Sequence, residues 1–89
     1  MKNKLDEARE IINAVDAEMI ELFKKRMAAS KMVAEYKKDV NMPILDEARE
    51  KLLIEKNIKL LNSKELEKYY KTFFEGVLNA SKDYQKDLI

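Results

Sequence analysis

The sequence has 89 residues, enough for one small domain with a modest hydrophobic core. Charged residues make up 39% of the chain, against roughly 25% in an average globular protein. Hydrophobic residues make up 46%, which argues against a disordered chain. The single Gly, the single Pro and the abundance of Glu, Lys, Leu and Ala leave little room for strands. We therefore expect an all-α fold with a single domain over residues 1–89.

The 18 basic and 17 acidic residues are interspersed and give a net charge of +1. No basic block is available to neutralise a run of phosphates, so we expect no nucleic-acid partner. The chain has neither Cys nor His, and so lacks a thiolate nucleophile, the commonest metal ligand and the commonest general base. Its first residues lack the apolar core of a signal peptide, and no apolar run approaches a membrane span. We expect a cytoplasmic protein that does not contact a membrane.

The first predicted element is one very long helix over about residues 4–40. Asn3 is a suitable N-cap, and Asn41 and Pro43 are suited to end the helix, because Asn tolerates a left-handed cap and Pro restricts the residue before it. At 1.5 Å per residue the helix is roughly 55 Å long. A compact chain of this length has a radius of gyration of only about 12 Å. We therefore expect the helix to pair with its copy in a second subunit, as a homodimer.

One face of this helix carries apolar residues at the spacing of three and four that indicates packing along its length. The seam consists of Leu5, Ala8, Ile12, Val15, Met19, Leu22, Arg26, Ala29, Val33 and Tyr36. The adjoining row consists of Arg9, Asp16, Phe23, Ser30 and Lys37, and mixes further charged residues into the same edge. A seam that is apolar except for a few cations predicts a packed helix that lines an anion-binding pocket.

Two shorter helices are predicted after it, over about residues 46–61 and 63–87. Asp46 can cap the first of them, and Asn62 with Glu65 can form a capping box for the second. The last helix has an apolar stripe of Leu66, Tyr69, Tyr70, Phe73, Val77, Ala80, Tyr84 and Leu88. Gly76 lies in the middle of this helix, where it costs roughly 1 kcal/mol relative to Ala and therefore suggests close packing.

Three cations of the long helix are candidates for binding an anion. Arg26 and Lys37 are eleven residues apart, so they face the same way at about 16 Å along the axis. Arg9 lies about 25 Å before Arg26, too far to share one pocket unless antiparallel pairing brings Arg9 of the partner subunit to Arg26. Structural interpretations remain open: Arg26 as a register-setting residue with a buried acidic partner, and Arg9 and Lys37 as snorkelling surface cations.

Two further polar clusters are candidates on the shorter helices. Asp46, Arg49 and Glu50 are three and four residues apart and share one face. Ser81 and Gln85, four apart, interrupt the apolar stripe of the last helix. The first cluster is also consistent with a helix cap and a solvated charge pair, and the second with the edge of a stripe near a frayed terminus.

Taken together, these polar residues resemble the all-helical chorismate mutases, from about Leu5 to Gln85. The resemblance rests on Arg9-(x)6-Asp16, Lys25-Arg26, Glu35-Tyr36-Lys37, Pro43-(x)2-Asp46-(x)2-Arg49-Glu50 and Ser81-(x)3-Gln85. It implies an intertwined homodimer of three-helix chains with two equivalent active sites. The implied reaction is the Claisen rearrangement of chorismate to prephenate, on the route to phenylalanine and tyrosine.

The resemblance also implies a role for each polar residue. Arg26 and Arg9 of the partner subunit would hold the two substrate carboxylates, and Lys37 and Gln85 would donate hydrogen bonds to the ether oxygen. The reaction is unimolecular and needs no nucleophile, metal or cofactor.

At the other end of the substrate, the same resemblance implies that Glu50 and the backbone of Asp46 hold the ring hydroxyl. Ser81 and Arg49 would complete the carboxylate end of the pocket. Two alternatives stay open from the sequence: an isochorismate pyruvate lyase of the same fold, and a helical dimerisation module without catalytic activity.

Overall fold

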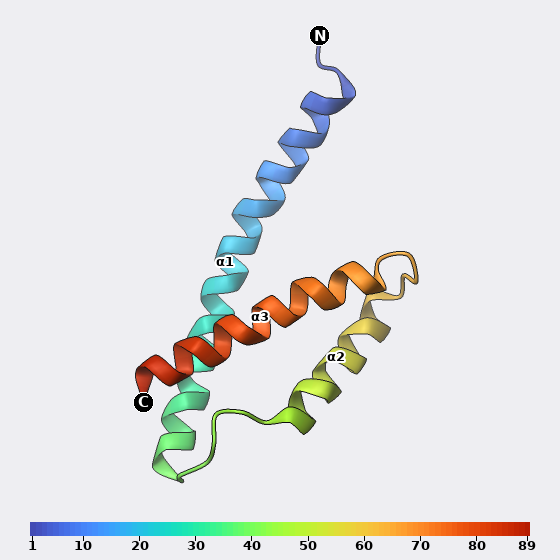
Figure 1. The fold of residues 1–89 in the computed structure, drawn as a ribbon. Helices are drawn as coiled ribbons and strands as arrows, with labels where there is room; N and C mark the ends of the chain where they lie inside the picture. The colour runs from blue at the N-terminus through green and yellow to red at the C-terminus, as the bar shows by residue number, and fades with distance from the viewer.

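The computed structural model describes all residues from Met1 to Ile89 and contains three α-helices and no strand (Figure 1). Helix α1 spans Lys4–Asp39, α2 spans Glu47–Leu61 and α3 spans Glu67–Leu88. The expected all-α class with one very long helix is confirmed. No helix is both long enough and apolar enough to cross a membrane.

Both ends of α1 follow from its sequence. At the start, the Asn3 side chain accepts a hydrogen bond of 2.9 Å from the backbone N–H of Asp6, as expected of an N-cap. At the end, Val40 caps the helix and Asn41 adopts a left-handed conformation with a φ of 55°. Pro43 follows in the extended loop that leads to α2. The predicted end near residues 40 and 41 is confirmed.

Helix α2 begins as predicted, whereas the predicted start of α3 is wrong. The Asp46 carboxylate accepts a hydrogen bond of 3.0 Å from the backbone N–H of Arg49 and caps α2. Asn62, expected to open a capping box with Glu65, instead takes a left-handed conformation with a φ of 48° as the C-cap of α2. A turn follows, and α3 begins only at Glu67 without a side-chain cap.

Helix α3 connects the other two helices. It packs across the C-terminal half of α1 and along α2, whereas α1 and α2 do not approach each other closely (Figure 1). The N-terminal half of α1 projects away from the rest of the chain (Figure 1). The molecule measures 59 × 26 × 16 Å with a radius of gyration of 16.5 Å, compared with about 12 Å for a compact chain of this length. The chain is therefore open and elongated.

The small core lies at the crossing of α1 and α3. Only six residues are buried: the apolar Ala34, Phe74 and Leu78, and the polar Ser30, Ser81 and Gln85. Half of the core is thus polar, which is unusual because buried polar groups require partners. The expected close packing at Gly76 is wrong within the chain, since a Cβ atom there would meet no atom within 4 Å.

The apolar seam of α1 is largely exposed in this chain. Seven of its residues each expose between 42% and 62% of their surface: Leu5, Ile12, Val15, Met19, Leu22, Val33 and Tyr36. An apolar row of this length on the outside of a chain normally marks a surface that another protein covers. The seam therefore leaves most of α1 without packing partners in its own chain.

Candidate active site

A cavity of about 300 Å³ lies where the C-terminal half of α1, the first turns of α2 and the last turns of α3 converge. Of the site residues expected from the sequence, it is lined by Arg26, Lys37, Asp46, Arg49, Glu50, Ser81 and Gln85. Two further polar side chains, Ser30 and Lys82, also line it. The volume is at the lower end of the range for small-molecule sites, about 300–1,000 Å³.

The charges of the cavity favour an anion. Its lining contains the cations Arg26, Lys37, Arg49 and Lys82 and the anions Asp46 and Glu50. These four cations and two anions give a formal charge of +2 within one protomer. A concave site with one dominant sign of charge concentrates ligands of the opposite sign.

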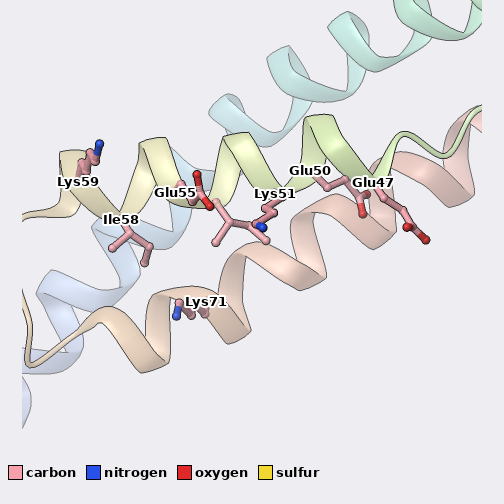
Figure 2. Close-up of a pocket in the computed structure, with 8 residues that line it drawn as sticks. Glu47, Glu50, Lys51, Glu55, Ile58, Lys59 and Lys71 are labelled. Carbon is pink, nitrogen blue, oxygen red and sulfur yellow. The ribbon is translucent and has the colours of Figure 1, made fainter.

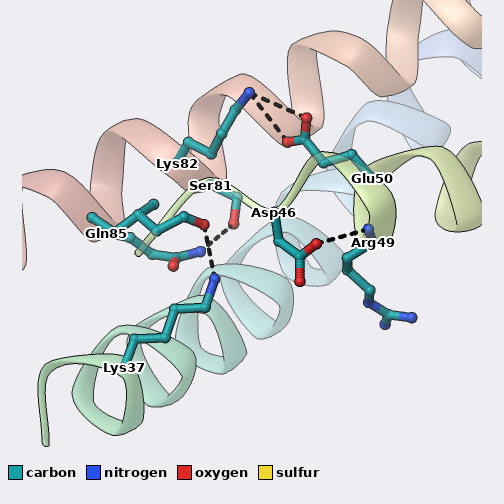
Figure 3. A network of polar contacts seen from close by, with 8 residues as sticks. Lys37, Asp46, Arg49, Glu50, Ser81, Lys82 and Gln85 are labelled. Atoms are coloured by element: carbon teal, nitrogen blue, oxygen red, sulfur yellow. Dashed lines mark hydrogen bonds and ion pairs between the residues drawn. The ribbon is translucent and has the colours of Figure 1, made fainter. Parts of the chain in front are cut away.

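Lys37 reaches the cavity from α1 and is held in place by the loop before α2. Its ammonium group donates a hydrogen bond of 2.8 Å to the backbone carbonyl of Ile44. The side chain extends toward α3, in the direction of Ser81 and Gln85 (Figure 3). Because Lys37 is half-buried and lines the cavity, its interpretation as a snorkelling surface cation is wrong.

Arg26 is oriented by an aromatic ring. Its guanidinium carbon lies 5.7 Å from the centroid of the Phe74 ring, a distance typical of a cation–π contact. Arg26 takes part in none of the ion pairs of the protomer, so the alternative of a buried acidic partner is wrong within this chain. A contact with a ring does not use the N–H donors of a guanidinium, and no carboxylate of this chain pairs with those of Arg26.

Three buried polar side chains form a short chain of hydrogen bonds beside the cavity. The hydroxyl groups of Ser30 and Ser81 are 2.6 Å apart, and the Gln85 amide nitrogen donates to the Ser81 hydroxyl at 3.2 Å. The amide oxygen of Gln85 is buried without a hydrogen-bond partner. The frayed-terminus interpretation of Ser81 and Gln85 is therefore wrong. A buried amide oxygen without a hydrogen-bond partner costs free energy on folding, and such atoms are uncommon in native structures.

Glu50 is paired across the α2–α3 interface. The Lys82 ammonium lies 3.1 Å from one carboxylate oxygen of Glu50 and 3.3 Å from the other (Figure 3). The interpretation of Asp46, Arg49 and Glu50 as a cap with a solvated charge pair is thus confirmed for the cap and wrong for the charge pair. Asp46 is the cap, but the partner of Glu50 comes from another helix.

A comparison with protein families identifies the chain. The family model described as chorismate mutase type II matches residues 8–86. The chain belongs to the chorismate mutase type II family. The match includes all eight site residues expected from the sequence, from Arg9 to Gln85. Comparisons with curated proteins and with solved structures gave no significant match.

One expected residue of this chorismate mutase type II chain lies outside the cavity. Arg9 is exposed on the projecting half of α1 and does not line the site that contains Arg26. The two arginines are seventeen positions apart on one uninterrupted helix, about 25 Å along the axis. The two side chains therefore cannot meet within one chain.

Ser30 and Lys82 were not predicted as site residues. Ser30 lies four residues after Arg26 on the same helix, so helical spacing alone could have placed it in the site. No comparable signal distinguishes Lys82 among the 18 basic residues of the chain. Its position becomes evident only once α2 and α3 are packed together.

A second depression, of about 630 Å³, lies between α2 and α3 (Figure 2). It is lined by Glu47, Glu50, Lys51, Ile54, Glu55, Ile58, Lys59 and Lys71. Its three carboxylates and three ammonium groups balance, so it has no net attraction for an anion. No group of three or more acidic side chains in the structure is arranged to hold a metal ion. The cavity around Arg26 and Lys37 is the better candidate for a chorismate mutase type II active site.

Proposed function

We propose that this chain is a chorismate mutase, which rearranges chorismate to prephenate in the biosynthesis of phenylalanine and tyrosine. The observation that carries the proposal is the single cavity in which three helices gather seven of the expected site residues. Chorismate carries two carboxylates, and the formal charge of +2 in the cavity is complementary to such a dianion. Family membership supports the same reaction.

The proposed reaction requires the site to hold one flexible molecule in a compact conformation. One C–O bond breaks and one C–C bond forms within the same substrate, so the protein contributes positioning and electrostatic stabilisation. Arg26, whose guanidinium lies against the Phe74 ring in the lining of the cavity, is proposed to bind one substrate carboxylate. Arg9 of the partner subunit would bind the other. When both carboxylates are held, the substrate loses conformational entropy on binding, so less remains to be lost on reaching the transition state.

Negative charge develops on the ether oxygen as the C–O bond breaks. Lys37 and Gln85, which line one cavity, are the proposed hydrogen-bond donors to this oxygen. Donors that interact more strongly with the transition state than with the substrate raise the turnover rate. The Gln85 amide nitrogen carries two N–H groups and donates only one of them, to the Ser81 hydroxyl, so the other is free for a bound substrate.

The remaining polar residues are proposed to orient the substrate ring. Glu50 and the backbone of Asp46 would hold the ring hydroxyl, and Ser81 and Arg49 would complete the carboxylate end. All four residues line the cavity.

The direct test is to incubate the purified protein with chorismate, follow the loss of its ultraviolet absorbance and identify the product. We expect prephenate. Formation of salicylate and pyruvate from isochorismate, without prephenate from chorismate, would instead establish the lyase. Absence of turnover with both substrates, combined with a stable assembly, would support the dimerisation module.

We further infer that the protein functions as a homodimer in which α1 of each chain packs on the other chain. The exposed apolar seam of α1 and the small core of the protomer support this inference. In sedimentation equilibrium at micromolar concentration, we expect a particle of twice the 10.5 kDa chain mass. A folded, helical monomer under these conditions would contradict the inference.

Sharing of the site between subunits leads to a complementation prediction. Arg9→Ala and Arg26→Ala should each be nearly inactive alone, since each removes one carboxylate contact from both sites. After the two variants are mixed and refolded, heterodimers should contain one site with both arginines. Random association should then restore about a quarter of the wild-type activity.

The control for this experiment mixes Arg26→Ala with the double variant Arg9→Ala/Arg26→Ala. No combination of these chains contains an intact site, so no activity should return. If the first mixture also regains nothing although heterodimers form, Arg9 does not act across the subunit boundary.

A further inference from the structure

Lys82 is the least expected member of the cavity. It lies on α3 between Ser81 and Gln85, is not among the residues implied by the resemblance, and reaches across to Glu50 on α2 (Figure 3). This is the only ion pair of the protomer that joins two helices. Both partners expose less than a quarter of their side chains, whereas the side chains of the other two ion pairs are 57–72% exposed. The pair is therefore better shielded from solvent than an ordinary surface pair.

The charge of Lys82 addresses a difficulty in the proposed site. Glu50 is an anion in a cavity that would receive a dianion, and like charges repel more strongly where water is partly excluded. Without Lys82, the formal charge of the lining would fall from +2 to +1. The Lys82 ammonium lies 3.1 Å from the Glu50 carboxylate and offsets its negative charge locally. Lys82 thus allows an acceptor to remain in the cavity without repelling the substrate.

The geometry of the pair also fixes where the Glu50 carboxylate points. The Lys82 ammonium contacts both carboxylate oxygens, at 3.1 and 3.3 Å. An ionised carboxylate has about four lone-pair positions on its two oxygens. The ammonium therefore leaves lone pairs free to accept a hydrogen bond from a ligand, while restricting the rotation of the Glu50 side chain.

We propose that Lys82 is a positioning residue of the active site, which neutralises Glu50 and holds its carboxylate ready to accept the ring hydroxyl of the substrate. This inference rests on the proposed function. It differs from a purely structural role, in which the ion pair would only fasten α2 to α3. The two roles predict different effects on substrate binding, because fastening alone changes stability and leaves the affinity of the folded protein unchanged.

The first test compares Lys82→Met with the control Lys86→Met, which removes an exposed Lys one turn further along the same helix. We expect Lys82→Met to raise KM for chorismate about tenfold, the effect of losing a charged hydrogen bond, with a smaller loss in kcat. Lys86→Met should leave both constants within twofold, and Lys82→Arg should recover most of the lost affinity. The melting temperature of each variant is measured alongside.

The second test is a double-mutant cycle with Glu50→Gln, which removes the charge that Lys82 is proposed to neutralise. In the Glu50→Gln background, Lys82→Met should change KM by less than twofold. An equal, tenfold effect in both backgrounds would overturn the proposal, because Lys82 would then act on the substrate directly. A lower melting temperature with unchanged KM would also overturn it, in favour of simple fastening. If Lys82→Met does not fold, Lys82→Gln carries the same expectations.

The wild-type protein separates this inference from the function on which it rests. Failure of the wild type to convert chorismate would overturn the proposed function and the role of Lys82 together. An active wild type whose KM is unaffected by Lys82→Met would overturn the role of Lys82 alone.

Discussion

Replacing Lys37 with Ala is expected to lower kcat by a factor on the order of 10²–10³, while KM changes only a few-fold. The Lys37 charge matters most when the ether oxygen becomes negative, so its loss affects the transition state more than the bound substrate. Arg26, which is expected to bind a carboxylate in both states, should show a large increase in KM when it is replaced. Steady-state kinetics with chorismate measures both constants.

Lys37 also holds the loop before α2 through its hydrogen bond to the Ile44 carbonyl, and two controls separate this role from catalysis. Lys37→Gln keeps a donor on a neutral side chain and should remain slow if the charge is what matters. Lys38→Ala removes the neighbouring exposed cation and should stay within twofold of the wild type. A Lys37→Ala enzyme within a few-fold of the wild type would remove Lys37 from the site.

Replacing Gln85 with Glu should abolish most activity at pH 7 and restore it progressively as the pH falls toward 5. Gln85 is a neutral donor, whereas an ionised carboxylate at this buried position would repel the charge that develops on the ether oxygen. In the Gln85→Glu variant, only the protonated carboxyl can donate a hydrogen bond. Activity should therefore rise by up to about tenfold for each unit by which the pH falls, as long as the carboxyl is mostly ionised.

The sign of this pH dependence does not depend on the exact pKa of the introduced carboxyl. Burial raises its pKa, while the neighbouring cations Arg26, Lys37 and Lys82 lower it. In either case the protonated form is the active one. The wild type should be nearly independent of pH between about 6 and 8, because the chain has no His, whose reference pKa is about 6.5.

Gln85→Met is the matched control, since it removes the donor without adding a titratable group. Its activity should be low at every pH in this range. A Gln85→Glu profile as flat as that of the wild type would show that Gln85 does not face the breaking bond.

The helices were predictable where a local signal had only one interpretation. Asn3 and Asp46 each precede an amphipathic run and cap it, and Asn41 with Pro43 ends α1. Asn62 had two possible roles, because Asn is favourable both as an N-cap and in the left-handed C-cap conformation. The structure uses it to end α2, and α3 consequently starts after an additional turn.

The sequence predicted that site residues lie close together where they share one face of a helix, or where they are part of the motifs that resemble the chorismate mutases. The contacts of Ser30 with Ser81 and of Lys82 with Glu50 were not predictable, because these partners are 51 and 32 positions apart in the sequence. Which Lys faces the cavity depends on how α3 is rotated against α2. That rotation is set by the packing of many side chains together, which no single spacing in the sequence records.

The projecting half of α1 has a consequence for how the protein reaches its folded state. Helices in proteins gain most of their stability from the packing of an apolar face, and the residues of this segment are all exposed in their own chain. Under the proposed assembly, its folding is completed only when two chains collide. The rate at which active protein forms would then be second order in chain concentration. A newly synthesised chain would expose an apolar helix surface to chaperones and proteases until it dimerised.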